Sequence, residues 1–234
     1  MDQSLHTPAA ERRRQEQENL KASRINHIIE CSFELFSENG IESISLNEIA
    51  EKSEIGVASL YRYFSTKDDL AIEVAVWAWK QENEIFKQIY ESESYKKMNG
   101  FKQISLLMEI FPTALVEHNS FFRFIYYFDA FVKRERISPE RLEKYEFTIN
   151  ALNQIVKDAL KKGRDDGTLN IKKNPDALIA SSTDEDIYFT FMHSVFSLAQ
   201  KLALSGDMLL MDKKVQSVTQ MELLIDIMLN TIKA

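Results

Sequence analysis

The chain of 234 residues contains little cysteine, glycine or proline. Its single cysteine, Cys31, excludes an internal disulfide and fits a reducing cytoplasm. Six glycines and four prolines are too few for a turn-rich β architecture, whereas 44% hydrophobic residues can build a sizeable core. No apolar run approaches the roughly 20 residues that a membrane-spanning helix requires. We therefore expect an all-α cytoplasmic protein with no membrane partner.

Positive charge is scarce as well, and it is unevenly placed. The formal net charge is −7, and residues 1–70 hold eight Lys or Arg against thirteen Asp or Glu. This balance argues against indiscriminate binding of nucleic acid, because the phosphate backbone attracts basic residues. Five basic residues nevertheless gather on an expected helix from Pro8 to Asn39: Arg12, Arg13, Arg14, Lys21 and Arg24. We interpret them as an arm that orders on phosphates, with a solvated charged extension as the alternative.

The sequence also lacks the motifs of catalysis and cofactor binding. It has no nucleophile elbow, phosphate loop or dinucleotide fingerprint, and its four histidines have no mutual metal-ligand spacing. Asp186, in an acidic cluster, shares a helix face with His193, but the two are about 10 Å apart along the axis at 1.5 Å per residue. One ion is not easily held at that separation, so a solvated or dimer-facing cluster is the simpler interpretation. We expect no enzyme, no cofactor and no metal site.

The most informative stretch present runs from Ser45 to Phe64 and predicts two short helices joined by a tight turn. Ser45 lies three residues before Glu48, the spacing of a capping box in which each side chain satisfies a free backbone amide. The break between the helices falls between Lys52 and Gly56. This pattern is that of a helix-turn-helix, whose second helix can lie in the major groove of DNA.

The second helix of this pair begins at about Val57 and buries Leu60 and Phe64. Small side chains, hydroxyls and one guanidinium then point outward, a surface that can enter a major groove without steric clash. Its phenols and serine can bind phosphates, whereas Val57, Ala58 and Arg62 are expected to face base edges. The residues expected to contact DNA are Arg24, Ser45, Val57, Ala58, Ser59, Tyr61, Arg62, Tyr63 and Lys67.

These residues carry a resemblance to the TetR family of bacterial transcriptional regulators, which runs from Ile28 to about Leu70. The matching positions are Cys31, Ser32, Leu35, Phe36, Gly40, Ser45, Ile49, Ala50, Leu60, Tyr61, Tyr63, Phe64, Lys67 and Leu70. Each position is a weak signal by itself, but the ordered set is specific. A helix-turn-helix shape that only packs is the alternative.

Two positions depart from the family pattern, which usually has Gly in the turn and Ser at the start of the recognition helix. This chain has Glu54 and Gly56 at those places. Glu54 is expected to adopt a positive φ, which is uncommon for a residue other than Gly and costs about 1 kcal/mol or more. Gly56 is an acceptable N-cap that supplies no side-chain oxygen.

Helical periodicity continues to the C-terminus. The expected helices cover residues 67–91, 101–117 with a kink at Pro112, 121–135 capped by Ser120, 138–162, 174–204 and about 215–232, with a loop at 92–100. The resemblance implies that the last two helices pair with their copies in a homodimer. The dry surface would then be supplied by Phe189, Met192 and Phe196 together with the series Val215, Val218, Met221, Ile225, Met228 and Ile232, although packing within one subunit also explains them.

Aromatic residues are concentrated between Phe121 and Phe131, where seven occur in eleven positions. One buried stripe does not need so many, and the resemblance implies a cavity for a small apolar or aromatic effector. The residues expected to line this cavity are Phe111, Phe121, Phe124, Tyr127, Phe128, Phe131 and Tyr188. An ordinary aromatic core is the alternative.

The sequence thus predicts an all-α protein with two parts. Residues 1–66 would form an N-terminal arm and a helix-turn-helix DNA-binding domain, and residues 67–234 a helical effector-binding and dimerisation domain. The resemblance implies a regulator that binds a palindromic DNA operator as a homodimer and is released by its ligand. Release of repression is the commonest behaviour of the family, but activators also occur. The competing interpretation is a helical adaptor that keeps the fold without sequence-specific DNA binding.

Overall fold

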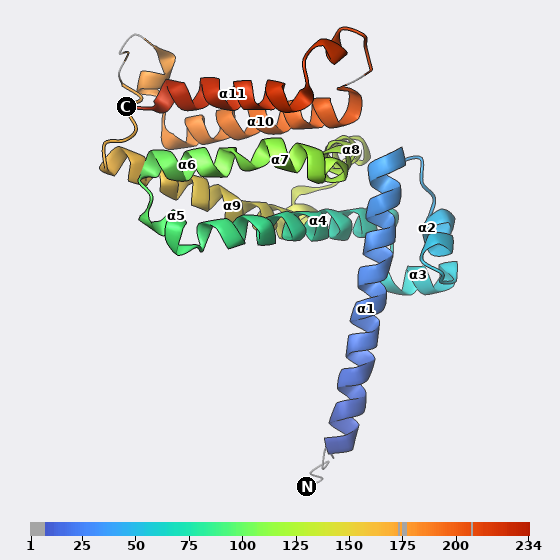
Figure 1. Cartoon of the computed structure of the whole chain (residues 1–234). Helices are drawn as coiled ribbons and strands as arrows, with labels where there is room; N and C mark the ends of the chain where they lie inside the picture. Colours follow the sequence, from blue (N-terminus) through green and yellow to red (C-terminus); the bar gives the residue numbers. More distant parts are fainter. Residues whose placement is uncertain (1–7, 173, 175–176, 207) are drawn as a thin grey trace. The chain divides into compact units, whose positions relative to one another are not determined.

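The computed structural model describes residues 8–172, 174, 177–206 and 208–234. These residues form α-helices and short 3-10 helices, as the sequence predicts, and the described part contains no β-strand (Figure 1). The chain divides into two compact units, of which the first ends at Val74 and the second begins at Ala75. The functional boundary expected between residues 66 and 67 lies slightly earlier and stays a prediction.

The first unit contains α1 (Pro8–Asn39), α2 (Leu46–Lys52), α3 (Val57–Tyr63) and the start of α4 (Lys67–Tyr90). Residues 11–24 of α1 are exposed, because this half of the helix has no apolar stripe. Gly40, with φ 82°, ends α1 by donating its N–H to the Phe36 carbonyl oxygen at 3.0 Å. The fully buried side chains of this unit include Ile28, Phe36, Ile41, Ile49, Leu60 and Leu70.

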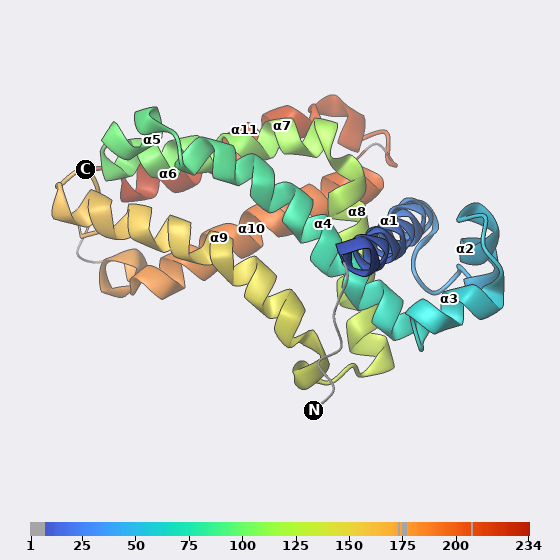
Figure 2. The ribbon, with the colours of Figure 1, turned by 90° about the horizontal axis from the view of Figure 1, so that it is seen from below.

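The second unit is a layered bundle of longer helices. They are the rest of α4, α5 (Glu93–Lys97), α6 (Gly100–Met108), α7 (Ile110–Glu117), α8 (Asn119–Glu135), α9 (Pro139–Asp165), α10 (Asp184–Ser205) and α11 (Ser217–Ile232), with 3-10 helices at Leu178–Ser181 and Asp212–Lys214. Helix α10 packs against α8, α9 and α11, while α6 packs against α9 (Figure 1). Figure 2 shows the start of α9 near the end of α8, where the rings of Tyr145 and Phe128 are 4.9 Å apart.

Helices α6 and α9 cross at two glycines. A Cβ atom on Gly100 would lie 2.0 Å from the backbone nitrogen of Gly163, so neither backbone leaves room for a side chain there. Close by, the backbone N–H of Gly100 donates to the carboxylate of Asp166 at 2.8 Å. The two helices are therefore held at a short distance by contact between their main chains.

Several helix ends differ from those predicted. The predicted loop at 92–100 contains α5, because the Ser92 hydroxyl accepts the Tyr95 N–H and caps a short helix. Helix α8 begins at Asn119 without a side-chain cap, so Ser120 lies inside it and is not the cap. Near Pro112 the helix breaks instead of only bending: α6 ends at Met108 and α7 begins at Ile110, since proline has no N–H to donate to the Met108 carbonyl.

The helix predicted at 174–204 also begins later. Pro175 and Asp176, two of the three residues that were expected to start it, lie outside the described residues. Helix α10 starts at Asp184, where Thr183 and Asp186 form a capping box. The preceding residues include a 3-10 helix, so the local chemistry of Thr183 determines the start of α10.

Candidate nucleic-acid interface and ligand cavity

Helix α2 starts with the predicted capping box. The Ser45 hydroxyl oxygen accepts the Glu48 N–H at 3.2 Å, and the Glu48 carboxylate accepts the Ser45 N–H at 2.7 Å. These bonds to Ser45 hold the pKa of Glu48 below its usual value. The hydroxyl of Ser45 also donates to the same carboxylate at 2.6 Å. The Glu48 carboxylate would therefore repel a phosphate at Ser45, and it already accepts the hydrogen of the Ser45 hydroxyl.

The turn between α2 and α3 adopts the strained geometry that the sequence predicts. Glu54 has φ 54°, the left-handed region, and its N–H donates to the Glu51 carbonyl oxygen at 3.0 Å. The N–H of Ile55 reaches back to the Ala50 carbonyl at 3.0 Å, which closes the end of α2. Gly56 is the N-cap of α3 and, as expected, makes no side-chain hydrogen bond.

Helix α3 buries one side and presents the other to solvent. Leu60 and Phe64 are buried, as predicted. Ala58, Tyr61 and Arg62 are exposed, with Tyr61 at 52%. The half-buried positions among the expected contact residues of this helix are Val57, Ser59 and Tyr63. The outward face of α3 is thus open, with one guanidinium and one phenol at its surface.

The two remaining basic candidates lie on other helices. Lys67 is half-buried at the start of α4, and its Nζ donates to the Glu42 carbonyl oxygen at 3.2 Å. Thr66 and Asp69 cap this helix, since Thr66 Oγ1 accepts the Asp69 N–H at 3.1 Å. Arg24 is exposed on α1. Lys67 is therefore positioned by the first unit, whereas Arg24 belongs to the solvated half of a long helix.

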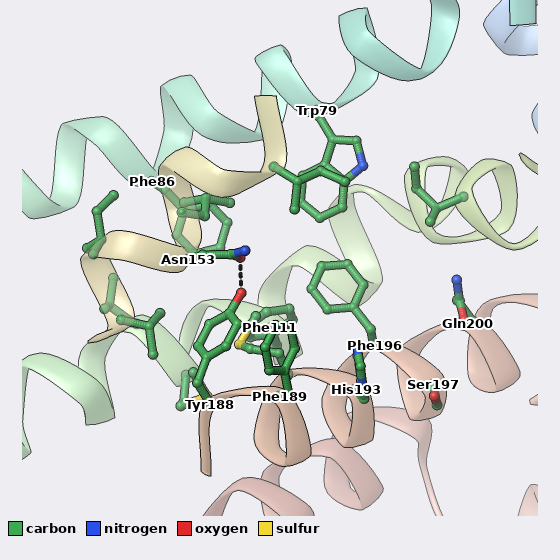
Figure 3. Close-up of a pocket in the computed structure, with 18 of the residues that line it drawn as sticks. Trp79, Phe86, Phe111, Asn153, Tyr188, Phe189, His193, Phe196, Ser197 and Gln200 are labelled. Carbon is green, nitrogen blue, oxygen red and sulfur yellow. Dashed lines mark hydrogen bonds between the residues drawn. The ribbon is translucent and has the colours of Figure 1, made fainter. Parts of the chain in front are cut away.

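The second unit contains a partly open cavity of about 280 Å³ (Figure 3). Its walls come from α4, α6, α7, α8, α9 and α10. The aromatic members of the lining are Trp79, Phe86, Phe111, Tyr145, Tyr188, Phe189 and Phe196. The ring of Phe196 lies 5.4 Å from that of Trp79 and 5.4 Å from that of Phe111, distances typical of packed aromatic pairs. This volume suits one small ligand.

Of the residues predicted to line a cavity, Phe111 and Tyr188 do so. The cavity lining does not include Phe121, Phe124, Tyr127, Phe128 or Phe131. Apart from the half-buried Tyr127, these side chains are buried in the core. Helix α8 instead turns Ile125 and Asp129 to the cavity, four residues apart on one face.

The polar groups of the cavity are gathered at two ends. At one end the Tyr188 hydroxyl donates to Asn153, which Figure 3 draws as a dashed line. At the other, Gln200 donates its Nε2 hydrogen to Asp129 at 3.3 Å. Figure 3 shows Gln200 on the far side of Phe196 from Tyr188. The aromatic rings therefore lie between an amide–phenol pair and a carboxylate.

Burial changes the proton affinity of the groups in this cavity. Asp129 is an exposed residue, yet the protein atoms around its carboxylate desolvate it enough to raise its pKa to about 6. Burial likewise raises the pKa of Tyr188 to about 12. Burial and the charge of Asp129 raise the pKa of Tyr145, whose hydroxyl oxygen accepts the Trp79 Nε1 hydrogen at 3.3 Å. Both phenols are neutral at physiological pH.

Sequence reasoning missed Trp79, Asp129, Tyr145 and Gln200 as members of this cavity. For Tyr145 and Gln200 the sequence did offer a signal, which is helical spacing. On α9, Tyr145, Ile149, Leu152 and Val156 recur by threes and fours. On α10 the fourfold spacing reads Tyr188, Met192, Phe196 and Gln200, all of which line the cavity. Met192 and Phe196 thus line this cavity, and their contribution to a dimer surface stays a prediction.

The acidic cluster at the start of α10 is occupied by local interactions. Asp186 belongs to the capping box with Thr183, Asp184 pairs with Arg164, and Glu185 pairs with Lys157 at 2.6 Å. Across the residues that the structure describes, no group of three or more His, Cys, Asp or Glu side chains is arranged to hold a metal ion. Nor does any helix in the described ranges combine the length and apolarity needed to cross a membrane.

Comparison with known proteins finds sequence similarity mainly in the first unit. The family model for bacterial regulatory proteins of the tetR family matches residues 28–74. An HTH-type transcriptional regulator of Staphylococcus aureus strain USA300 is 35% identical over 71 residues, which are 27% of this chain and 38% of that protein. A regulator from the bovine strain RF122/ET3-1 is 47% identical over 47 residues, 20% of this chain and 25% of that protein. The match thus spans well under half the length of these relatives.

Solved structures extend the similarity to the whole fold. A TetR-family regulator from Agrobacterium tumefaciens superposes with a TM-score of 0.65 at 19% identity, covering 91% of this chain and 99% of that one. Bacillus subtilis FadR, solved with stearoyl-CoA, gives 0.60 at 15% identity, covering 88% and 98%. A Saccharomonospora viridis protein, solved with choline, gives 0.65 at 15% identity, covering 91% and 99%. The first unit therefore matches the tetR-family model over its helix-turn-helix, and the chain as a whole has the fold of solved TetR-family regulators.

Proposed function

We propose that this protein is a ligand-responsive transcriptional repressor that binds a palindromic DNA operator as a homodimer. The observation that carries the proposal is the outward face of α3, where Ala58, Tyr61 and Arg62 are exposed while Leu60 and Phe64 are buried. A short helix held by its buried side and open on the other can lie in a major groove. The single guanidinium of that face can donate two hydrogen bonds to a guanine.

A homodimer would place two copies of α3 on one duplex. In helix-turn-helix dimers the two half-sites are about 34–36 Å apart, one turn of DNA, or a multiple of that distance. The apolar side chains left exposed on α10 and α11 support pairing through these helices, since Phe189 is 45%, Leu223 58% and Ile227 54% exposed. Such side chains gathered on neighbouring helices are typical of a surface that a second copy covers.

The cavity of the second unit is the proposed effector site. Proteins of the same fold were solved with stearoyl-CoA and with choline, which supports a ligand role for an internal cavity of this unit. Helix α4 begins at Lys67 in the first unit and contributes Trp79 and Phe86 to the cavity, so it connects the two along the chain. A ligand can lower operator affinity only to the extent that it binds the state without DNA more tightly than the DNA-binding state. A difference of about 2.8 kcal/mol between its binding free energies for the two states corresponds to ~100-fold in operator affinity.

Selection of binding sites from random DNA duplexes tests the proposal. We expect enrichment of one palindrome whose half-site centres are about 10–10.5 base pairs, or a multiple, apart. Arg62→Ala, run in parallel, should enrich the same half-site less strongly or with one base position relaxed. If the parent protein enriches no sequence at low salt, the regulator proposal fails.

A helical adaptor without DNA binding is the second candidate. It is favoured by the Glu48 carboxylate, which engages the hydroxyl of Ser45 at 2.6 Å where a phosphate was expected. The excess of acidic residues in residues 1–70 points the same way. The adaptor predicts that the selection recovers only random sequence, whereas an enriched palindrome excludes it.

A further inference from the structure

The cavity contains one carboxylate and no basic side chain to balance it. Among the described residues that line it, Asp129 is the only Asp or Glu, and neither Lys nor Arg occurs. The one hydrogen bond to the Asp129 side chain in the described chain comes from Gln200, at 3.3 Å. An amide carries no charge, so the negative charge of Asp129 stays uncompensated in the ligand-free protein. Asp129 is also exposed to solvent, so water solvates it in part, and a bound cation would supply the countercharge that the lining lacks.

Lys157, which is outside the cavity lining, does not serve this carboxylate. Its Nζ lies 5.7 Å from the ring centre of Tyr188 and 5.9 Å from that of Phe189. Figure 3 shows these two rings at the other end of the cavity from Gln200. Lys157 pairs with Glu185 at 2.6 Å. One end of the cavity therefore has the neutral pair of Asn153 and Tyr188, near a lysine whose charge Glu185 balances. The other end is acidic because of Asp129.

The walls between these ends are aromatic. The ring centres of Trp79 and Phe196 are 5.4 Å apart (Figure 3). The hydroxyl oxygen of Tyr145 accepts a hydrogen bond from Trp79 Nε1, with 3.3 Å between the two atoms. The face of an aromatic ring carries partial negative charge and attracts cations, most strongly for Trp. Rings and carboxylate thus favour the same sign of ligand charge.

From this arrangement we infer that the effector is a lipophilic monocation, an amine or quaternary ammonium with an apolar or aromatic body. Its positive group lies against Asp129, and its body packs among Trp79, Phe111 and Phe196. A neutral ligand would leave the carboxylate uncompensated, and an anion would add repulsion that no Lys or Arg of the described lining offsets. The inference rests on the proposed role of the cavity as the effector site.

The protonation of Asp129 is consistent with this role. With a pKa of about 6 the carboxylate is mostly ionised at neutral pH, and a bound cation would favour the ionised form further. The other titratable side chains of the lining are Tyr145, Tyr188 and His193. The phenols are neutral, and the His193 ring lies 5.6 Å from Phe189, toward the Tyr188 end.

Calorimetric titration of the full chain at pH 8 with three matched probes tests the inference. The probes are (4-phenylbutyl)trimethylammonium, its neutral analogue with carbon in place of nitrogen, and 4-phenylbutanesulfonate. We expect the cation to bind at least about 10-fold more tightly than the neutral analogue, a difference of about 1.4 kcal/mol, and the anion to bind most weakly. Asp129→Asn should remove this preference while the neutral analogue binds as before. Glu135→Gln, an exposed change on the same helix outside the cavity, should leave the preference intact.

The outcomes separate this inference from the proposed function. Equal binding of cation and neutral analogue to the parent, or a preference that survives Asp129→Asn, overturns the cation inference and leaves a ligand cavity in place. No binding of any probe also overturns it. If the charge preference depends on Asp129 but the DNA selection enriches nothing, the cation site stands and the proposed regulator does not.

Discussion

The guanidinium of Arg62 donates a hydrogen bond to the hydroxyl of Ser59, with 2.6 Å between Nη2 and Oγ. The two residues are three positions apart, so the bond runs along the outward face of α3. It holds the long side chain of Arg62 close to its own helix before any DNA is present. An arginine ordered in advance loses less conformational entropy on binding.

Arg62→Ala should weaken binding to the selected operator by about 1–3 kcal/mol, the range of a good bidentate base contact. Its thermal midpoint should stay close to that of the parent, because Arg62 is exposed. Ser59→Ala should cost less, and the double variant should show a coupling of at least about 0.5 kcal/mol. Fluorescence anisotropy with a labelled operator measures all four proteins. Equal operator affinity for parent and Arg62→Ala would remove Arg62 from the interface.

Lys67→Ala should lower DNA affinity uniformly across sequences. Lys67 lies at the start of α4 with its Nζ on the Glu42 carbonyl, 3.2 Å away, and is expected to reach a phosphate and not a base. Loss of one phosphate contact reduces the slope of log affinity against log salt by roughly 1. The measurement is a salt titration of operator and random DNA. An effect confined to one base position would contradict the phosphate role.

Glu54→Gly should stabilise the protein by about 1 kcal/mol, because Gly adopts the left-handed φ of 54° without steric cost. Arg136, at the end of α8, has the same φ of 54°, so Arg136→Gly is a matched variant in the second unit. Glu51→Gly, inside α2, is the control and should destabilise by a similar amount. Chemical denaturation measures the three changes. A loss of stability in Glu54→Gly would mean that the Glu side chain contributes more than the strain removes.

Gly100→Ala should destabilise the protein by about 3 kcal/mol, since the added Cβ would lie 2.0 Å from the backbone of Gly163 and overpacking cannot be relieved by a side-chain rotation. Gly56→Ala is the control: no atom lies within 4 Å of its Cβ, and only the N-cap preference changes. Thermal or urea unfolding distinguishes the two. Similar midpoints for both variants would show that α6 can move away from α9.

Asp129→Asn should raise the stability of the ligand-free protein at pH 7. The folded protein raises the pKa of Asp129 from 3.8 to about 6, so folding binds a proton between these values and the contribution of Asp129 becomes less favourable as pH rises. The advantage of the variant should therefore be full above about pH 6 and vanish below about pH 4. Thermal midpoints of parent and variant over pH 4–8 measure it. A difference independent of pH would exclude desolvation of the carboxylate as its cause.

The starts and ends of helices were predictable where their chemistry is local. Ser45 and Glu48 lie within one helical turn, so their spacing alone predicts the cap that the structure contains. The positive φ of Glu54 followed from its place in the turn. Where the determinant is a later residue, as with Thr183 at the start of α10, an earlier Asn-Pro-Asp signal was misleading.

The cavity was not predictable to the same degree. Whether Phe124 or Asp129 faces it depends on which helices pack against α8, and the sequence of α8 alone does not specify its neighbours. The density of aromatic residues predicts that Phe121, Phe124 and Phe128 line the cavity, but these side chains fill the core. The place of Asp129 in the cavity depends on α10, which brings Gln200 within hydrogen-bond distance of it. These two residues are 71 positions apart in the sequence, so local patterns do not reveal the pairing.

The contact between Gly100 and Gly163 has a consequence for ligands of different size. Helices α6 and α9 both supply walls of the cavity, and at Gly100 and Gly163 their main chains are in contact, where the Gly100 N–H bond to Asp166 ties α6 to the end of α9. We therefore expect a larger ligand to gain volume at the other end of α9, near Tyr145 and Asp129. In a series of ammonium compounds with apolar groups of increasing size, the larger members should shift the start of α9 and the end of α8 before other parts of the cavity wall.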